Sequence, residues 1–514
     1  MNKIKLTLLS IGVGITMCET VLAGGILTNT NQNVHFNRNF ARCGTIGIDG
    51  VYSNPAGVAF MPQGLHISFN WQNAYQTRTI NSGMTVPALQ GTPFYQPFKM
   101  NGGEENGIKE FEGEASVPII PSLQAVYNMD EHWGFQLNFS ITGGGGKCTF
   151  NHGLGSFERT ISMIPAMLYQ QGLTGEGNVP AYSVSSYLSG RQYVIGLQLG
   201  ATYKFNDHLA VYGGARFNYI SNRYKGNITN ISANIGNQMT NLYDYFGSQA
   251  ESYKILAANY SVQASQAPTP EIAAQLTAAA EQCNAAAQKF DQSRHQFADR
   301  YLDCTQTGWG ITPIIGVDFK WNKWNFGARL EFTNHLNIEN DTERDDTGLF
   351  QDGVNTPGDL PGLFSIGAQY EILPKWRVMA SYHYFFDKDA KMDKGKQKLL
   401  SGNTQEFLVG TEYDITDAIQ VSVGGQRTKY GLGDGSFLSD MSFVTSSYSI
   451  GFGAGIQVSK MAKVNIAYFW TSYETFDKEY TEEMSAGGTT LTVNNTDSFT
   501  RTNKVLGVGV DLTF

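Results

Sequence analysis

From residue 64 to the C-terminus, apolar and polar residues alternate in successive runs, and each run ends in a turn. One run places Tyr193, Ile195 and Leu197 at odd positions, with Val194, Gly196 and Gln198 between them. Successive side chains of a β-strand point to opposite faces, so each run has one apolar face and one small or polar face. The pattern predicts an all-β protein.

Fourteen such runs follow one another, and the connections between them alternate between very short and long. An even number of strands, with short turns at one rim and long loops at the other, is typical of outer-membrane barrels. The sequence therefore predicts a 14-stranded antiparallel transmembrane β-barrel over residues 64–514. Its runs lie near 64–79, 115–129, 132–145, 190–205, 208–226, 308–321, 324–340, 361–373, 376–388, 402–413, 418–431, 446–459, 462–475 and 501–514.

Tryptophan placement distinguishes this prediction from a soluble β-sandwich, which also alternates. Four of the seven tryptophans flank short turns: Trp133, Trp321, Trp324 and Trp376. Amphipathic rings at one height are typical of the interface between a membrane and water. The chain also ends on Phe514 after an alternating run, as many outer-membrane barrels do.

The first 23 residues have the pattern of a cleaved signal peptide. A short basic start is followed by an apolar stretch from Leu6 to Met17, and Val21-Leu22-Ala23 provides small residues before a cleavage point. About 12 apolar residues are too few to span a bilayer, which needs about 20. We therefore expect export and a location in the outer membrane of a Gram-negative-type cell.

Composition and motifs exclude several classes of function. Lys and Arg number 36 against 45 Asp and Glu, a net charge of −9, so the basic excess of a nucleic-acid binder is absent. The sequence contains no GxSxG elbow, HExxH helix or Walker loop. We expect no enzyme activity, no catalytic residue, no cofactor and no metal site.

Four cysteines follow the signal peptide, and an oxidising compartment allows three ways of pairing them. Cys283 and Cys304 fall in one long connection, which makes this pair the preferred disulfide. The alternative pairings involve Cys43 and Cys148.

Residues 24–63 precede the barrel and do not alternate. They contain Asn54-Pro55-Ala56, and a fourteen-run pattern and a terminal Phe follow them. On these features the chain resembles the FadL family of outer-membrane transporters for long-chain fatty acids and other hydrophobic molecules. The resemblance implies that residues 24–63 form a hatch inside the barrel. Read alone, Asn-Pro makes a tight turn.

The resemblance also implies a mechanism of passive uptake without ATP. Loops capture the ligand in an extracellular groove, the hatch gates its release, and it leaves sideways into the membrane. The implied partners are a hydrophobic ligand, outer-membrane lipid and lipopolysaccharide, and the chain is expected to be a monomer. The alternatives are a diffusion porin for polar solutes and a transporter of another hydrophobe, such as an aromatic hydrocarbon or a haem-like ring.

Residues 227–307 form the longest connection, and their pattern predicts a helical hairpin in an extracellular loop. Thr269-Pro270-Glu271 supplies an N-cap, a first-turn proline and a first-turn acid. An earlier apolar stretch predicts a partner helix before Pro268. The resemblance makes the apolar residues of this loop and of 341–360 candidates for the ligand groove: Leu242, Tyr245, Phe246, Leu349 and Phe350. Alternatively, these side chains simply pack on each other.

Two further sets of candidates concern ligand release and recognition. Gly143, Gly144, Gly145 and Gly146 end the third run, and glycines weaken strand pairing. By resemblance they form a lateral window; the alternative is a flexible junction. A basic residue facing the lumen is expected to meet a ligand carboxylate, and Lys204 and Arg216 both qualify by position.

Overall fold

The computed structural model describes residues 28–95, 107–178, 182–486 and 489–514. The proposed signal peptide, residues 1–23, lies outside the described residues. No helix in the described ranges is long and apolar enough to cross a membrane.

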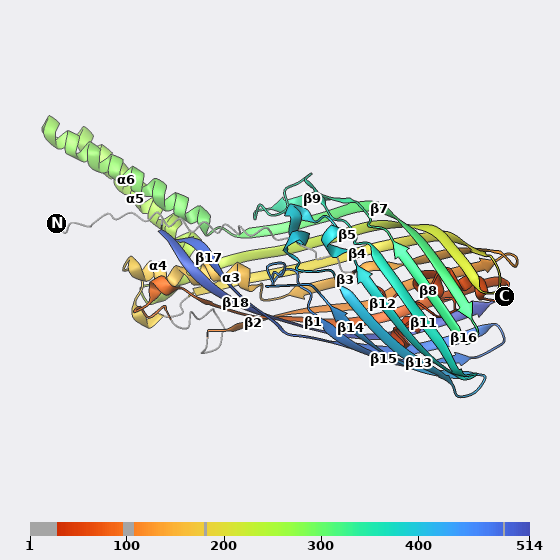
Figure 1. Cartoon of the computed structure of the whole chain (residues 1–514). Helices are drawn as coiled ribbons and strands as arrows, with labels where there is room; N and C mark the ends of the chain where they lie inside the picture. Colours follow the sequence, from red (N-terminus) through yellow and green to blue (C-terminus); the bar gives the residue numbers. More distant parts are fainter. Residues whose placement is uncertain (1–27, 96–106, 179–181, 487–488) are drawn as a thin grey trace.

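Fourteen antiparallel strands of the described chain close into one barrel, as the alternation predicts (Figure 1). Neighbours in sequence are neighbours in the wall, and β1 closes the barrel by pairing with β18, from His66↔Thr513 to Thr85↔Asn494. The barrel strands are β1 (Gly64–Thr85), β2 (Lys109–Asn128), β3 (Trp133–Phe150), β4 (Tyr182–Lys204), β5 (Leu209–Ile235), β7 (Arg300–Trp321), β8 (Trp324–Glu331), β11 (Leu363–Leu373), β12 (Trp376–Phe385), β13 (Gln405–Asp414), β14 (Ile419–Lys429), β15 (Ser447–Gln457), β16 (Ala462–Tyr473) and β18 (Thr489–Thr513).

One predicted run is wrong as a single strand. The run 324–340 contains β8, which ends at Glu331, and a separate strand β9 (Asn337–Asp345). Between them the chain leaves the wall and crosses the inner face of β7, where a side chain at Gly308 or Gly310 would collide with it. The two glycines make room for this detour, which a pattern read along one strand does not reveal.

The outer face of the barrel is apolar and the inner face is polar. Phe69 and Trp71 of β1 are 52% and 40% exposed and point outward, whereas Ser68 and Asn70, which alternate with them, are buried inside. The four tryptophans beside the short turns are all exposed, at the end of the barrel where the chain terminates (Figure 1). We call this the short-turn end.

The wall is much taller on one side than on the other. β5 has 27 residues and β18 has 25, whereas β12 and β13 have 10 each. The tall side carries further strands beyond the barrel, whose bounds are β6 (Gln238–Asn241), β9, β10 (Asn355–Pro357) and β17 (Phe476–Ala486).

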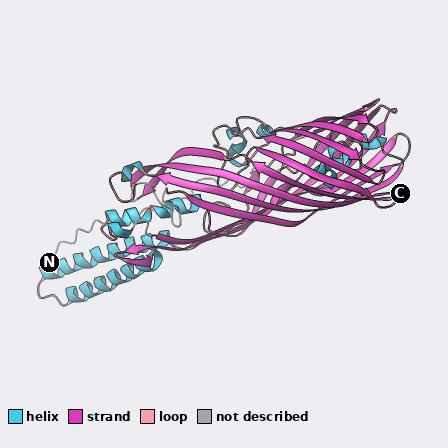
Figure 2. Cartoon of the chain, turned by 90° about the horizontal axis from the view of Figure 1, so that it is seen from below, coloured by secondary structure: helices cyan, strands magenta, loops and turns pink. Residues whose placement is uncertain are grey.

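Two long helices stand beyond the tall wall, away from the short turns (Figures 1 and 2). They are α5 (Leu242–Ser265) and α6 (Pro270–Gln296), and Thr269 caps α6 by accepting a hydrogen bond from the Ile272 N–H, as the sequence predicts. The remaining helical elements are α1 (Val34–Arg38), α2 (Gly50–Ser53), η1 (Gly57–Phe60), η2 (Pro87–Leu89), α3 (Gly155–Ser162), α4 (Ile164–Gln170), η3 (Glu176–Asn178), η4 (Asp387–Asp389) and η5 (Asp393–Leu399).

Residues 28–63, which we call the inner segment, contain α1, α2 and η1 and lie inside the barrel (red in Figure 1). Their polar groups bond to inward side chains on opposite parts of the wall. The Val34 N–H donates to Asn70 of β1, the Arg42 guanidinium to Glu412 of β13, and Gln198 of β4 donates to the Val51 carbonyl. Wide barrels enclose either an aqueous channel or a plugged lumen. Here the inner segment obstructs the lumen.

Candidate functional site

The Asn54-Pro55-Ala56 turn is fixed to three strands of the wall. The Asn54 amide donates to Asp318 of β7 at 2.5 Å and to the Thr45 carbonyl at 3.1 Å. Gln136 of β3 donates to the Pro55 carbonyl, and Ala56 packs against Tyr212 of β5. A side chain at Gly57 would collide with Asn54, so this glycine is required by close approach. The tripeptide is an anchor of the inner segment.

A second anchor joins the inner segment to the short wall. The Cys43 sulfur lies 3.2 Å from Nε2 of His383 on β12, and Nδ1 of the same ring lies 2.8 Å from Glu406 on β13. All three side chains are buried. The ring therefore links the segment to two neighbouring strands.

The wall itself is interrupted between β2 and β3. These strands pair from Gly113↔Phe150 to Ala115↔Cys148, and again only from Ser122↔Ser140 toward the short turns. Residues 116–121 of β2 therefore face 141–147 of β3 without ladder pairs, and we call this interval the gap. Gly144 and Gly146 lie in it with φ of 91° and 76°, values that glycine adopts without strain.

The other edge of the gap has its own cause in the sequence. Pro118 and Pro121 of β2 lack the N–H needed for a ladder hydrogen bond. The register between β1 and β2 also shifts there, between Gln72 and Ala74. The glycines mark only the β3 edge of the gap. Pro118 and Pro121 are the sequence signal for the β2 edge, which the glycines alone do not predict.

The first described residues of the inner segment lie behind the gap. Thr28 forms an isolated bridge with Gly143, and the Asn29 N–H donates to the Thr142 carbonyl at 2.9 Å. At the gap's lower edge, the Gln32 carbonyl accepts from Ser122 of β2, while its side-chain oxygen accepts from Asn138 and Ser140 of β3. The segment thus bonds to both strands at the point where their ladder resumes below the gap.

A cavity of about 150 Å³ inside the barrel borders the gap directly. Val117 and Ile120 of β2 and Gly144 and Gly146 of β3 belong to its lining. Its apolar floor is an aromatic cluster in which Phe40 contacts Phe36 and Phe469 edge to face, at centroid distances of 5.2 and 5.5 Å. A molecule in this cavity lies between an apolar floor and an interruption in the wall.

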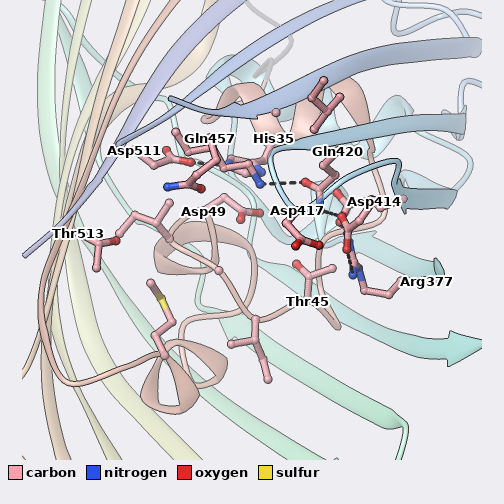
Figure 3. Close-up of a pocket in the computed structure, with 18 of the residues that line it drawn as sticks. His35, Thr45, Asp49, Arg377, Asp414, Asp417, Gln420, Gln457, Asp511 and Thr513 are labelled. Atoms are coloured by element: carbon pink, nitrogen blue, oxygen red, sulfur yellow. Dashed lines mark hydrogen bonds and ion pairs between the residues drawn. The ribbon is translucent and has the colours of Figure 1, made fainter. Parts of the chain in front are cut away.

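A second, larger space lies on the other side of α1. A chamber of about 710 Å³ opens toward the short-turn end and is lined by charged groups (Figure 3). His35 lies 2.8 Å from Asp511, and Arg377 lies 2.7 Å from Asp414. Arg42 bridges Asp49 and Glu412 at 2.7 and 2.8 Å. Helix α1 lies between the two spaces, with His35 lining the chamber and Phe36 lining the cavity at the gap.

The structure does not bring the groove candidates together. Leu242, Tyr245 and Phe246 belong to an apolar cluster at the base of α5 and α6, where Phe246 is fully buried against Phe297. Leu349 and Phe350 belong to another cluster, in which Phe350 stacks on Tyr224 at 5.1 Å. These residues pack on their own surroundings, which is the alternative that the sequence left open.

Neither predicted carboxylate partner is a free cation. Arg216 forms a two-pronged ion pair with Glu331, at 2.8 and 3.0 Å. Lys204 lies beside the short turn after β4, 3.8 Å from Asp207. Glu331 is 115 positions away from Arg216 in the sequence, so the pattern along β5 does not reveal this ion pair.

The preferred disulfide is also wrong. All four cysteines of the described chain are free thiols. Cys283 lies within α6, 13 residues before the helix ends at Gln296, whereas Cys304 lies on β7. At 1.5 Å per residue, this places Cys283 about 20 Å up the helix, too far for a bridge.

A solved structure shows the same fold. A Pseudomonas aeruginosa FadL homologue superposes with a TM-score of 0.59 over 96% of this chain and 100% of its own, at 13% identity. The Pseudomonas putida toluene transporter TodX gives 0.47 over 91% and 94%, also at 13% identity, and the CymD monoaromatic hydrocarbon channel gives 0.44 over 96% and 99% at 12%. No protein-family model matches the sequence, and no curated protein does. The resemblance to the FadL family is confirmed at the level of the fold.

Proposed function

We propose that this protein is an outer-membrane transporter of the FadL type, which takes up long-chain fatty acids or similar hydrophobic molecules passively. The inner segment serves as its hatch, and the ligand leaves sideways through the gap. The observation that carries the proposal is a cavity that has an aromatic floor and borders the gap, separated by α1 from a charged chamber.

A ligand in the cavity has two possible routes out, toward the charged chamber or through the gap, and the free energy of transfer favours the gap. Each buried methylene contributes about 0.8 kcal/mol, so exposing ten of them in the charged chamber costs about 8 kcal/mol. Passage through the gap instead transfers the chain from the aromatic floor of the cavity to the hydrocarbon of the bilayer. The sideways route keeps the ligand out of water, and it needs no energy source.

The outer surface supports a location in the membrane. Side chains such as Phe69, Val423 and Phe452 are exposed on the barrel wall, and the tryptophans at the short turns suit an aromatic belt. A strand of 10 residues, tilted by about 40°, rises about 25 Å, which matches the apolar band of such barrels. The short strands of this protein are therefore just long enough to span.

A diffusion porin requires an open lumen, and the inner segment opposes that function. Arg38 and Phe40 are essentially unexposed, and bonds from the segment reach strands around the wall. We expect purified protein in planar bilayers to give no steady open-pore conductance. A stable conductance in every channel would favour the porin instead.

A reversible crosslink across the gap tests the exit route. An ideal Cβ at Gly146 lies 3.5 Å from the Cβ of Val117, within the range of disulfides. We propose Val117→Cys with Gly146→Cys, in a Cys148→Ser background because Cys148 lies two residues away. Uptake of labelled oleate by cells carrying the oxidised variant is expected to fall at least tenfold, and to recover when dithiothreitol opens the bridge.

The matched control bridges the same two strands where they already pair. Ala115→Cys faces the native Cys148 in the ladder above the gap. Oxidation of this pair is expected to leave uptake at the level of the reduced protein. If the fully crosslinked 117–146 variant transported as well as the control, the gap would not be the exit.

A further inference from the structure

Two arginines of neighbouring strands meet face to face inside the barrel. Arg78 of β1 and Arg501 of β18 are register partners, and both point inward because the inward positions of these strands include Gln76 and Asn503. Like charges directly opposite each other destabilise a sheet. A negative charge close to both guanidinium groups would offset this repulsion.

In the part of the chain that the structure describes, no carboxylate is paired with either arginine. Arg501 is 4% exposed, donates from Nη2 to Gln76 at 3.1 Å, and lies 4.8 Å from the centre of the Tyr473 ring. The Nε of each arginine is buried without a hydrogen-bond partner.

Three other arginines inside the same barrel are paired with carboxylates. Arg216 has Glu331, Arg159 has Asp497, and Arg42 has both Asp49 and Glu412. The arginines at 78 and 501 are two positive charges at one level of the wall without such an arrangement. Burying an uncompensated charge is costly, so a ligand that neutralises the pair gains binding energy there.

The pair also lies where the proposed ligand resides. Arg501 lines the 150 Å³ cavity at the gap, and Arg78 lines a smaller adjoining cavity of about 30 Å³. Gly146, at the edge of the gap, belongs to both linings. The described lining of the larger cavity has one carboxylate, Glu406, whose oxygens are occupied by His383, Gln426 and Thr428.

We infer that Arg78 and Arg501 form a binding site for the anionic head group of an amphiphile. Its apolar body lies on the floor made by Phe36, Phe40 and Phe469 and reaches the gap at Val117 and Ile120. Rigid, planar guanidinium groups suit a carboxylate, which accepts two parallel hydrogen bonds. This inference rests on the proposed function and narrows the class of ligand, because a neutral hydrocarbon has neither a negative charge nor a hydrogen-bond acceptor for the two arginines.

The test compares ligands of equal apolar length that differ in charge. Binding of decanoate and of decanol is measured by competition with a fluorescent probe, on full-length mature protein in nanodiscs with empty discs subtracted. The wild-type protein is expected to prefer decanoate at least tenfold. Arg78→Gln and Arg501→Gln are each expected to lower that preference about tenfold, whereas Arg78→Lys and Arg501→Lys retain most of it.

The matched control is Lys504→Gln, which removes a positive charge from the outer face of the same strand. It is expected to leave the preference unchanged. Folding is checked by the difference in gel mobility between heated and unheated samples. The ligand-free glutamine variants are expected to unfold at or above the wild-type temperature, because the repulsion between the arginines is gone.

The outcomes separate this inference from the proposed function. Equal binding of decanoate and decanol, unaffected by the glutamine variants, would refute the anion site but leave a transporter of hydrophobic molecules. Failure of the wild type to bind either ligand would overturn both. Two acids distinguish the source of the carboxylate: preference for decanoate over benzoate supports a fatty acid, and the reverse preference supports an aromatic acid.

Discussion

The Asn54 anchor gives the sharpest test of a mobile inner segment. Asn54 is 1% exposed, and its amide makes one bond to a carboxylate, Asp318, and one to the Thr45 carbonyl. Asn54→Ala removes both bonds without adding bulk. The barrel strands keep their own ladders, so we expect the change to loosen the segment and to leave the wall intact.

The magnitude follows from the two bonds. A hydrogen bond to a charged group contributes about 1.5–3 kcal/mol, and a neutral one about 0.5–1.5 kcal/mol. Their loss raises the free energy of the anchored state by about 2–4.5 kcal/mol. Since 1.4 kcal/mol corresponds to a factor of ten, the released population rises roughly 30- to 1,600-fold.

Hydrogen exchange measured by mass spectrometry reports that population. Peptides from residues 28–63 of Asn54→Ala are expected to exchange faster by this factor, while peptides from β4 and β5 keep the wild-type rate. Gln63→Ala is the matched control, because it removes an exposed amide at the end of the same segment. Unchanged exchange in the Asn54 variant, or equal acceleration throughout the barrel, would refute the anchoring role.

Three further predictions concern other parts of the molecule. Phe246→Ala removes the ring that stacks on Phe297 and is expected to cost about 3–5 kcal/mol at the base of α5 and α6; limited proteolysis should then cut residues 242–297 while the barrel keeps its heat-dependent gel mobility, and loss of that mobility would contradict it. Denatured, unreduced mature protein should react with maleimide at all four cysteines, Cys43, Cys148, Cys283 and Cys304, and a shortfall reversed by reductant would reveal a disulfide. Burial alone would raise the pKa of Asp345, but bonds from Thr347 and from the backbone N–H groups that follow lower it below 3.8. The stability from these bonds is therefore present above the unfolded pKa of about 3.9 and is lost as the pH falls through the folded pKa. Relative to cleavage of an unstructured reference peptide by the same pepsin, cleavage near residues 345–350 should be faster at pH 2.5 than at pH 4.5, and Asp345→Asn should show no such contrast.

Many strands of the wall were predictable because the sequence signals that define them lie within or next to each strand. Alternation with period 2 fixes which face of a strand is apolar, and short turns fix its neighbours, so residues 190–205 already identified β4. Thr269-Pro270 similarly marks the start of α6 within one turn of chain. These signals need no knowledge of the rest of the molecule.

The interior was less predictable because it depends on pairings between distant residues. Arg216 and Arg501 are equivalent in the sequence, as inward arginines on alternating strands. Only the closed barrel brings Glu331 to the first and Arg78 to the second. The gap has a similar origin, since the glycines of β3 weaken the ladder only where the prolines of β2 also withhold their N–H groups.

The unequal heights of the wall give the molecule a front and a back. At about 3.3 Å per residue and a tilt of about 40°, β5 rises about 68 Å while β12 rises about 25 Å. In the bilayer that we propose, the short strands end near the surface and the tall side continues about 40 Å above it, so the rim is cut obliquely. A ligand therefore reaches the rim more easily from the side of the short strands than from the tall side. Surface polysaccharides and neighbouring proteins obstruct this approach when they stand in front of the short strands, and leave it clear when they stand behind the tall side. The rotation of the protein about the membrane normal would then decide from which directions a ligand can reach it.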